Sequence, residues 1–318
     1  MTAIRSRSRW ARTGLACTTA VVVASALPAV PAEATTAKHP QTLRDTDTAM
    51  HGEALAHASY YLYARQAGRE RLGEVERLFD KTARTELHDH FTKESAIVRL
   101  VRDDASNLRD SITGERYEST RMYPTFAKQA REDGDHNAAQ LFSEIAQDES
   151  RHLRAFEQAL DVVTHHRPDR DVPPGPTAGP VDVPAGPAEV RSARTLRNLE
   201  TAMQGEAFAN AKYTLYAEHA QAENRPKLAN LFRRTAEVEL TEHFAGEAKL
   251  AGLVQRTRAN LRRSIKNETY EARTMYPGFA RTARAEGDEN AARLFTEIAH
   301  DEAGHARAFQ AALRRLDR

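Results

Sequence analysis

The sequence predicts an all-α protein made of two tandem four-helix bundles joined by a proline-rich linker. A stretch of about 120 residues occurs twice without a gap, and each copy places apolar residues at helical spacing. No stretch shows sustained strand alternation. Charged residues make up 29% of the 318 residues, and aromatic residues and glycines are sparse, which favours surface helices rich in Ala, Leu, Glu and Arg.

Residues 1–34 have the features of a secretory signal peptide. A basic start precedes the mostly apolar stretch from Thr13 to Leu27, and Ala32-Glu33-Ala34 offers a small-x-small cleavage site. We favour this over a lipoprotein signal at Cys17, because Gly14 stands where such a signal wants leucine. The apolar stretch is too short for a permanent anchor. We therefore expect a secreted or extracytoplasmic chain, cleaved near Ala34, with no membrane span.

Cleavage would change the charge and the cysteine content. It would remove four arginines and Glu33 from 46 basic and 45 acidic residues, which leaves a net charge of about −2. That charge gives no electrostatic argument for nucleic acid as a partner. Cys17 is the only cysteine, so the mature chain would hold no disulfide and no cysteine-ligated iron centre.

Dense proline divides the two copies. Residues 163–193 contain Pro168, Pro173-Pro174-Gly175-Pro176 and further prolines, which exclude a helix and favour an extended spacer. We expect the first bundle at residues 41–162, the linker at 163–193 and the second bundle at 194–316. The linker is long enough for the two bundles to pack as a pseudo-dimer within the chain, and the oligomeric state stays open.

Each copy is expected to form four helices. In the first copy they are Thr42–Ala67, Leu72–Val101, Asp104–Asp133 and Asp135–Val162, with a break at Gly68, one near Arg102 and one at Gly134. In the second copy Pro226 and Gly287 fall at similar places. Pro124 and Pro277 lie inside helical patterns, where we expect a kink. Short connections predict antiparallel neighbours within each copy.

Six residues of metal-binding type recur at an offset of 153 residues, as between Glu53 and Glu206. The pairs are Glu53/Glu206, Glu86/Glu239, Glu115/Glu268, Glu118/Glu271, Glu149/Glu302 and His152/His305. Each lies on the apolar stripe of its helix: Glu149 and His152, for example, share a face with Ile145 and Phe156. We expect all six to point into their bundle.

Buried carboxylates of this number need a counter-charge. Left ionised and unpaired in a low-dielectric core, they would cost many kcal/mol. No arginine occupies these stripes, so divalent cations are the natural partner. Surface positions differ between the copies, as Arg116 and Thr269 do, while the six ligand types are unchanged. The sequence therefore predicts a metal site in each bundle.

The motifs resemble rubrerythrin, a family of the ferritin-like superfamily. The resemblance rests on Gly52-Glu53, on Glu115-Arg116-Tyr117-Glu118 leading to Met122-Tyr123-Pro124, and on Glu149-x-x-His152, and both copies carry it. It implies ferritin-like bundles, each with a dinuclear metal centre of lone glutamates and Glu-x-x-His motifs. Iron is the metal implied first, and manganese the second.

The resemblance also implies a role for each position. Glu86 and Glu149 would bridge two metals in the first bundle, and Glu239 and Glu302 in the second. Terminal ligands would be Glu53, Glu115, Glu118 and His152, and then Glu206, Glu268, Glu271 and His305. Four tyrosines match those that hydrogen-bond ligand carboxylates, although core tyrosines fit equally well: Tyr60, Tyr123, Tyr213 and Tyr276.

One ligand position departs from the family pattern. The family's second helix usually carries Glu-x-x-His, whereas here an acid stands at i+3 and a histidine at i+4. Either Asp89 and Glu242 replace the histidine, or a local π-bulge turns His90 and His243 inward. We favour the acids, because regular helix geometry then suffices. An acid-rich site would prefer Mn²⁺ or iron to zinc or copper.

The resemblance implies an oxidoreductase that reduces peroxide or dioxygen. The rubredoxin-like segment of many rubrerythrins is absent from a cysteine-free chain, so electrons would come from an external donor, whose identity is open, or from Fe²⁺. A non-catalytic iron- or manganese-binding protein is the main alternative. An interaction module that kept only the helical shell is a third, and the intact ligand sets argue against it.

Overall fold

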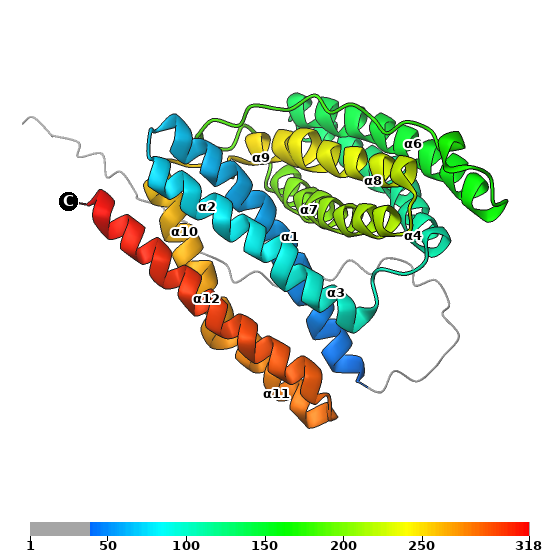
Figure 1. Ribbon diagram of the computed structural model, residues 1–318. Helices are drawn as coiled ribbons and strands as arrows, with labels where there is room; N and C mark the ends of the chain where they lie inside the picture. The colour runs from blue at the N-terminus through cyan, green and yellow to red at the C-terminus, as the bar shows by residue number, and fades with distance from the viewer. Residues whose placement is uncertain (1–38, 318) are drawn as a thin grey trace, which may run out of the picture. The chain divides into compact units, whose positions relative to one another are not determined.

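The structure, a computed structural model, describes residues 39–317, which are helical apart from turns and connections (Figure 1). The first repeat forms four long helical segments, two of them interrupted by a π-helix. They are α1 (Pro40–Arg69); α2 (Gly73–Thr85), η1 (Glu86–Phe91) and α3 (Thr92–Val98); α4 (Asp104–Tyr117), η2 (Glu118–Met122) and α5 (Tyr123–Glu132); and α6 (His136–Thr164). The all-α prediction is confirmed for this part of the chain.

The second repeat has the same order of elements. They are α7 (Ala193–Ala222); α8 (Pro226–Val238), η4 (Glu239–Phe244) and α9 (Ala245–Ala251); α10 (Thr257–Tyr270), η5 (Glu271–Met275) and α11 (Tyr276–Glu286); and α12 (Glu289–Leu316). A π-helical segment directly precedes Pro124 and Pro277, each of which lies in the first turn of its helix. The first turn tolerates proline, because its N–H would have no helical partner there.

The two bundles exchange helices between the repeats. The first half of repeat one, α1 and α2, packs against α10, α11 and α12 from repeat two. Conversely, α7 from repeat two packs against α4 and α5 from repeat one, and α9 from repeat two packs against α6 from repeat one. In Figure 1, α12 accordingly runs beside α10 and α11 and next to α2, and α6 lies with α8 and α7. This differs from the expected arrangement, in which residues 41–162 and 194–316 each form a bundle alone.

The connection between the second and third helical segments explains why helical periodicity did not predict the exchange of helices. Residues 99–103 and 252–256 are short, and they lead from one bundle into the other. Both begin in the left-handed region, at Arg99 (φ 53°) and Gly252 (φ 63°). An apolar stripe is buried whichever copy supplies its partner, so helical periodicity cannot distinguish a bundle of one repeat from an exchanged one.

The proline-rich segment lies on the second repeat as a strap. We use this name for residues 165–192, in which η3 (Asp169–Asp171) is the one short helix. Backbone N–H groups of the strap donate to the second helical segment, from Val181 to Thr241 O at 2.8 Å and from Glu189 to Leu250 O at 2.8 Å. Val172 and Val183 are buried. The spacer is extended, as predicted, and it is also packed.

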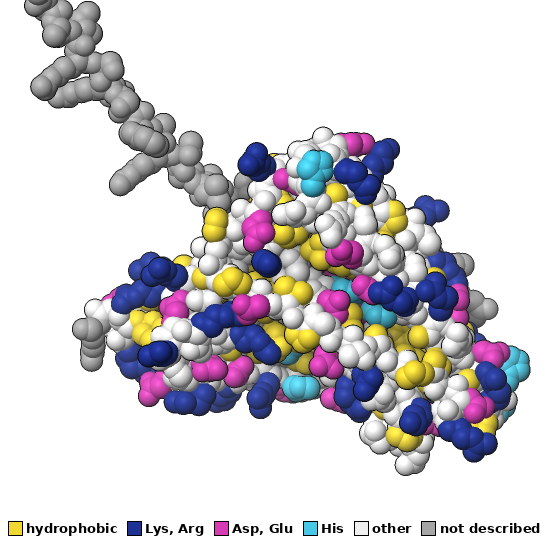
Figure 2. Space-filling model, turned by 90° about the horizontal axis from the view of Figure 1, so that it is seen from above, with side chains coloured by type: hydrophobic (Ala, Val, Ile, Leu, Met, Phe, Trp, Pro, Cys, Tyr) yellow, Lys and Arg dark blue, Asp and Glu magenta, His cyan; other side chains and the backbone are white. Residues whose placement is uncertain are grey.

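The surface carries charges of both signs. Figure 2 shows Lys and Arg interspersed with Asp and Glu over the face in view, as the near-zero formal charge leads one to expect. Within residues 39–317, no helix combines the length and apolar character needed to cross a membrane. The predicted signal peptide, residues 1–34, lies outside the described residues.

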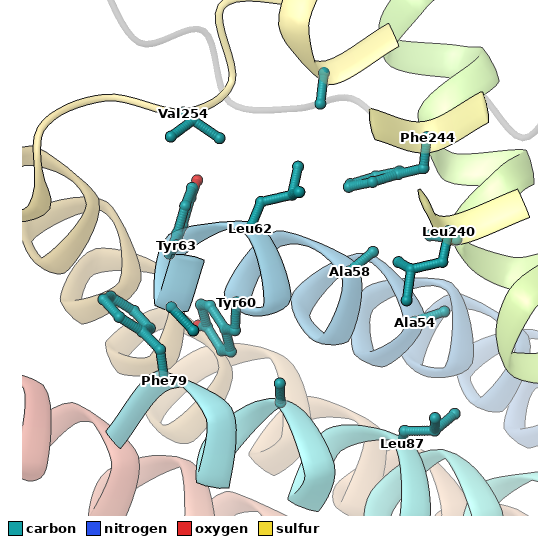
Figure 3. Packing of buried hydrophobic residues seen from close by; sticks show 14 of the residues in the cluster. Ala54, Ala58, Tyr60, Leu62, Tyr63, Phe79, Leu87, Leu240, Phe244 and Val254 are labelled. Atoms are coloured by element: carbon teal, nitrogen blue, oxygen red, sulfur yellow. The ribbon is translucent and has the colours of Figure 1, made fainter. Parts of the chain in front are cut away.

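The largest core cluster joins the two repeats. Ala54, Ala58 and Leu62 on α1 face Leu240 and Phe244 on η4 (Figure 3). The opposite side of α1 packs in the same cluster against α2 and α12, where aromatic rings meet in tilted or edge-on contacts. Because α1 also contacts α7, the two exchanged bundles share one continuous apolar core.

Candidate metal centres

Fourteen buried or half-buried acids and histidines gather in two equivalent clusters, one inside each exchanged bundle. Cluster A consists of Glu53, Glu86, His90, Glu268, Glu271, Glu302 and His305. Cluster B consists of Glu206, Glu239, His243, Glu115, Glu118, Glu149 and His152. Each cluster takes three residues from one repeat and four from the other. The exchange of helices is therefore also an exchange of ligands.

The π-helical segments bring the seventh residue into each cluster. Glu86 and His90 are four apart within η1, and both are buried; Glu239 and His243 repeat this within η4. A π turn inserts an extra residue, which rotates the i+4 position onto the face of the first glutamate. Of the two alternatives at the seventh position, the structure shows the histidines.

The favoured alternative at that position differs from the structure. Asp89 is half-exposed and bound to Lys93, with Oδ1 2.7 Å from Nζ. Glu242 accepts a hydrogen bond from the backbone N–H of Gly179 in the strap, at 2.7 Å. Regular helix geometry would have turned these acids inward, and the π-helix turns them out.

In cluster A two glutamates lie between two histidines. His90 Nδ1 is 2.9 Å from Glu86 Oε2 and 2.9 Å from Glu302 Oε1. His305 Nδ1 is 3.0 Å from Glu302 Oε2 and 3.2 Å from Glu86 Oε1. Each carboxylate thus offers one oxygen to either side. Glu53 closes the His90 side at 3.5 Å, and Glu268 closes the His305 side at 3.4 Å.

Cluster B repeats this geometry closely. His243 Nδ1 is 2.8 Å from Glu239 Oε2 and 3.0 Å from Glu149 Oε1. His152 Nδ1 is 3.0 Å from Glu149 Oε2 and 3.2 Å from Glu239 Oε1. Glu206 and Glu115 close the two sides, each at 3.6 Å.

The pairing of the central glutamates differs from the expectation. The resemblance implied Glu86 with Glu149 in one site and Glu239 with Glu302 in the other. The structure pairs Glu86 with Glu302 and Glu149 with Glu239. The residue types are those expected, and the difference follows from the exchange of helices.

Glu118 and Glu271 lie beside the clusters rather than within their tightest groups. Both are half-exposed side chains, whereas the other glutamates of the clusters are buried. Burial of the Glu118 carboxylate, together with Glu149, Glu115 and Glu239, raises its pKa well above the ordinary value.

The four predicted tyrosines each donate to a cluster carboxylate across the repeats. Tyr213 donates to Glu115 at 2.6 Å, and Tyr60 donates to its equivalent, Glu268. Tyr123 and Tyr276 donate to the other terminal glutamates, Glu206 and Glu53 respectively. All four hydroxyls are buried, and each fixes one carboxylate oxygen so that the other oxygen faces the cluster.

Two further buried glutamates were missed by the sequence analysis. Glu94 and Glu247 are fully buried, and their Oε1 atoms lie 2.9 and 3.0 Å from the hydroxyls of Tyr276 and Tyr123. Burial and the nearby Glu53 raise the pKa of Glu94. The signal was present: these residues are four positions after His90 and His243 and differ by the same 153 residues.

The chemistry of the two clusters fits a pair of cations in each. Among the described residues, both carboxylate oxygens of Glu86 and Glu239 and both ring nitrogens of His90 and His243 are buried without a hydrogen bond. Buried polar atoms are rarely left so. Donor atoms about 3 Å apart suit an ion that binds each of them at about 2.1 Å.

The charge balance supports the same conclusion. Burial raises the pKa of Glu53 to about 7, against the lowering effect of His90. Burial and the neighbouring Glu302 raise the pKa of Glu268 to about 8. Without cations, the clusters therefore retain protons near neutral pH, and binding of cations would displace them.

Comparisons with known proteins identify the family. A family model described as Rubrerythrin matches residues 47–160 and again 197–313. Rubrerythrin of Nitratidesulfovibrio vulgaris is 34% identical over 133 residues, which cover 38% of this chain and 69% of the relative. Nigerythrin of the same organism is 36% identical over 137 residues, covering 39% and 67%. Rubrerythrin of Porphyromonas gingivalis is 31% identical over 145 residues, covering 40% and 70%.

The family model matches both repeats. Each matched range contains three residues of one cluster and four residues of the other. The repeats are thus two copies of the family's helical region, and the carboxylate–histidine clusters are those that a di-iron carboxylate protein requires. This chain belongs to the rubrerythrin family.

Proposed function

We propose that this chain is a secreted oxidoreductase with one dinuclear centre in each cluster, which reduces peroxide or dioxygen. Iron is the preferred metal and manganese the second. The observation that carries the proposal is the pair of glutamates in each cluster, Glu86 with Glu302 and Glu149 with Glu239, which offer an oxygen to each of two positions. Secretion rests on the leader at residues 1–34.

The chain's residues divide into holding and positioning groups. The central glutamates would hold both ions, while the histidines and the remaining glutamates would each hold one. A pair of redox-active ions, when bound, supplies the two electrons that reduction of an O–O bond requires. Tyr276 and Tyr123 keep Glu53 and Glu206 oriented, and their second contacts, Glu94 and Glu247, are buried carboxyls able to hold a proton close by.

The proposal needs an electron source beyond residues 35–318. Residues 35–318 contain no cysteine, so they hold no cysteine-ligated iron centre. The reductant is therefore a separate donor or Fe²⁺ itself. Electron donors are scarcer outside the cytoplasm, which favours the alternative function, an iron- or manganese-binding protein without turnover.

Anaerobic loading with Fe²⁺ separates these functions. We expect peroxide to oxidise the bound iron and, with a reductant present, to be consumed repeatedly beyond the amount of bound iron. Metal binding followed by a single oxidation or none would support metal binding without turnover instead. Unchanged metal content after Glu149→Ala and Glu302→Ala together would contradict both and leave an interaction module.

A further inference from the structure

A third group of ligand atoms lies just outside cluster A. Asp89, His90 and Asp301 each place one donor atom within 4.8 Å of the others. His90 Nδ1 faces cluster A, while Nε2 faces outward and is 3.6 Å from Asp301 Oδ2. The carboxylates are accessible, since the Asp301 side chain is 53% exposed and that of Asp89 41%. We call these three residues the outer group.

The outer nitrogen of His90 supplies an observation independent of the acids. The ring is fully buried, and within the described residues Nε2 has no hydrogen bond. Neutral imidazole carries one N–H and one lone pair, and each normally finds a partner when buried. A buried nitrogen without a hydrogen bond, close to accessible aspartate oxygens, is a typical ligand arrangement for a divalent cation.

The equivalent position outside cluster B has its acids already engaged. His243 Nε2 is also without a hydrogen bond and lies 3.8 Å from Asp148 Oδ2. Asp148, however, forms an ion pair with Arg151, and Glu242 is bound by the strap at Gly179 N. No cation could take these two carboxylates without breaking an ion pair and a hydrogen bond.

At cluster A the corresponding contacts on the aspartates are either absent or made by an exposed side chain. Gly304 stands at the position of Arg151, so Asp301 has no arginine from its own helix turn. Lys93 forms an ion pair with Asp89, and its side chain is 46% exposed. Solvent screens an ion pair at an exposed lysine, so an arriving ion can displace Lys93, and this is one contact fewer than it must break at cluster B.

We propose that Asp89, Nε2 of His90 and Asp301 form an outer cation site, which takes a hard divalent ion such as Fe²⁺ or Mn²⁺ and leads it to cluster A. The proposal rests on the metal-binding part of the proposed function and not on turnover. His90 links the two positions, because Nε2 faces the outer site and Nδ1 faces the cluster. The ring offers one lone pair at a time, so it serves the outer ion first and the inner ion afterwards.

This arrangement predicts that the two clusters load at different rates. Cluster A has an accessible carboxylate site on its path, whereas outside cluster B the Asp148 side chain is only 20% exposed and Glu242 is held by the strap. Local negative charge raises the association rate of cations by tenfold or more at low salt. Metal-free protein mixed with Mn²⁺ should therefore take up metal in two phases of similar amplitude.

Gly304→Arg tests the assignment by giving cluster A the arginine of cluster B. The position is open, since the nearest atom to an added Cβ is Arg307 Nη2 at 3.9 Å, and arginine favours the helix over glycine. We expect the fast phase to slow about tenfold while the final Mn²⁺ content stays that of the parent. Gly304→Gln, of similar size without charge, should keep the fast phase, and Lys93→Gln should accelerate it.

The outcomes separate this inference from the proposed function. Identical two-phase uptake by the parent and Gly304→Arg would overturn the outer site, as would loss of the fast phase in Gly304→Gln as well. Uptake in a single phase by the parent protein would overturn it too. If the parent bound no Mn²⁺ at all, the proposed function would fail first.

Discussion

Clusters A and B contain the same residue types at equivalent positions, yet their outer surfaces differ. Outside cluster B, the strap holds Glu242 and Arg151 neutralises Asp148. Outside cluster A, Asp89 is paired with Lys93, and Asp301 has Gly304 three residues further along its helix, where Asp148 has Arg151. The interior of a metal centre is thus repeated almost without change, while access to it differs between the copies. Treatments and substitutions that act on both clusters, or on one of them, should distinguish the effect of the shared interior from the effect of the different access.

Removal of metal should have the largest effect, because it leaves the buried carboxylates of both interiors with only histidines and retained protons to balance their charge. Metal that binds only the folded chain stabilises it by mass action, and buried carboxylates lose their partners when it leaves. A loss of several kcal/mol lowers the melting temperature of a chain this size by on the order of 10 °C. Calorimetry before and after chelation measures this. An unchanged melting temperature would argue against metal in the core.

A substitution under the strap should be much more destabilising than a change at the equivalent residue of the first repeat. Gly252 has φ 63°, and an added Cβ would lie 2.3 Å from Ala188 N in the strap. Gly252→Ala should destabilise the protein by at least about 2 kcal/mol, through left-handed strain and this clash. At the equivalent residue, Arg99→Gly should stabilise it by about 0.5 kcal/mol, since glycine relieves the same strain. Urea unfolding of both variants decides whether the strap is the cause.

The tyrosines test whether the two interiors are equivalent. Tyr276→Phe removes hydrogen bonds to Glu53 and Glu94, and Tyr123→Phe removes those to Glu206 and Glu247. Each should cost about 1–3 kcal/mol, because a buried carboxylate loses its donor. Equal losses in denaturant unfolding of the metal-loaded variants are expected. A marked inequality would show that the interiors differ as well as the surfaces.

The smallest effect concerns the start of α7. Asp133 binds Arg194 and Ser192, and chiefly the Arg194 contact lowers its pKa to about 2. A lowered pKa stabilises the fold above the ordinary value and loses that effect as pH falls towards about 2. The urea midpoint of metal-free parent should exceed that of Asp133→Asn at pH 5, and the difference should shrink below about pH 4. A difference independent of pH would contradict the assignment.

Periodicity and the internal repeat predicted the helices well. The expected segment Asp135–Val162 agrees closely with α6, and the expected Thr42–Ala67 with α1. Apolar residues at helical spacing decide which face is buried, and that face carried the predicted ligands. Periodicity could not show whether a helix packs against helices of its own repeat or of the other repeat. The two repeats are so similar that their apolar stripes fit either arrangement.

The π-helices were the second feature that limited prediction from the sequence. A π turn costs hydrogen-bond geometry, and only tertiary contacts make it favourable. Local sequence favoured Asp89 because an α-helix would turn it inward, whereas the structure has His90 there. The histidines at 90 and 243 recur at the offset of the other ligands, as do Glu94 and Glu247. A search for every acid and histidine that recurs at this offset would have found all four residues.

Metal content of two double variants tests the central claim, that each centre is built from both repeats. Glu53 and Glu302 lie in different repeats but in one cluster, whereas Glu53 and Glu149 lie in one repeat but in different clusters. Glu53→Ala with Glu302→Ala should leave about half of the metal of the parent protein. Glu53→Ala with Glu149→Ala should damage both centres and leave much less. The reverse order of metal contents, in folded protein, would contradict the exchange of helices.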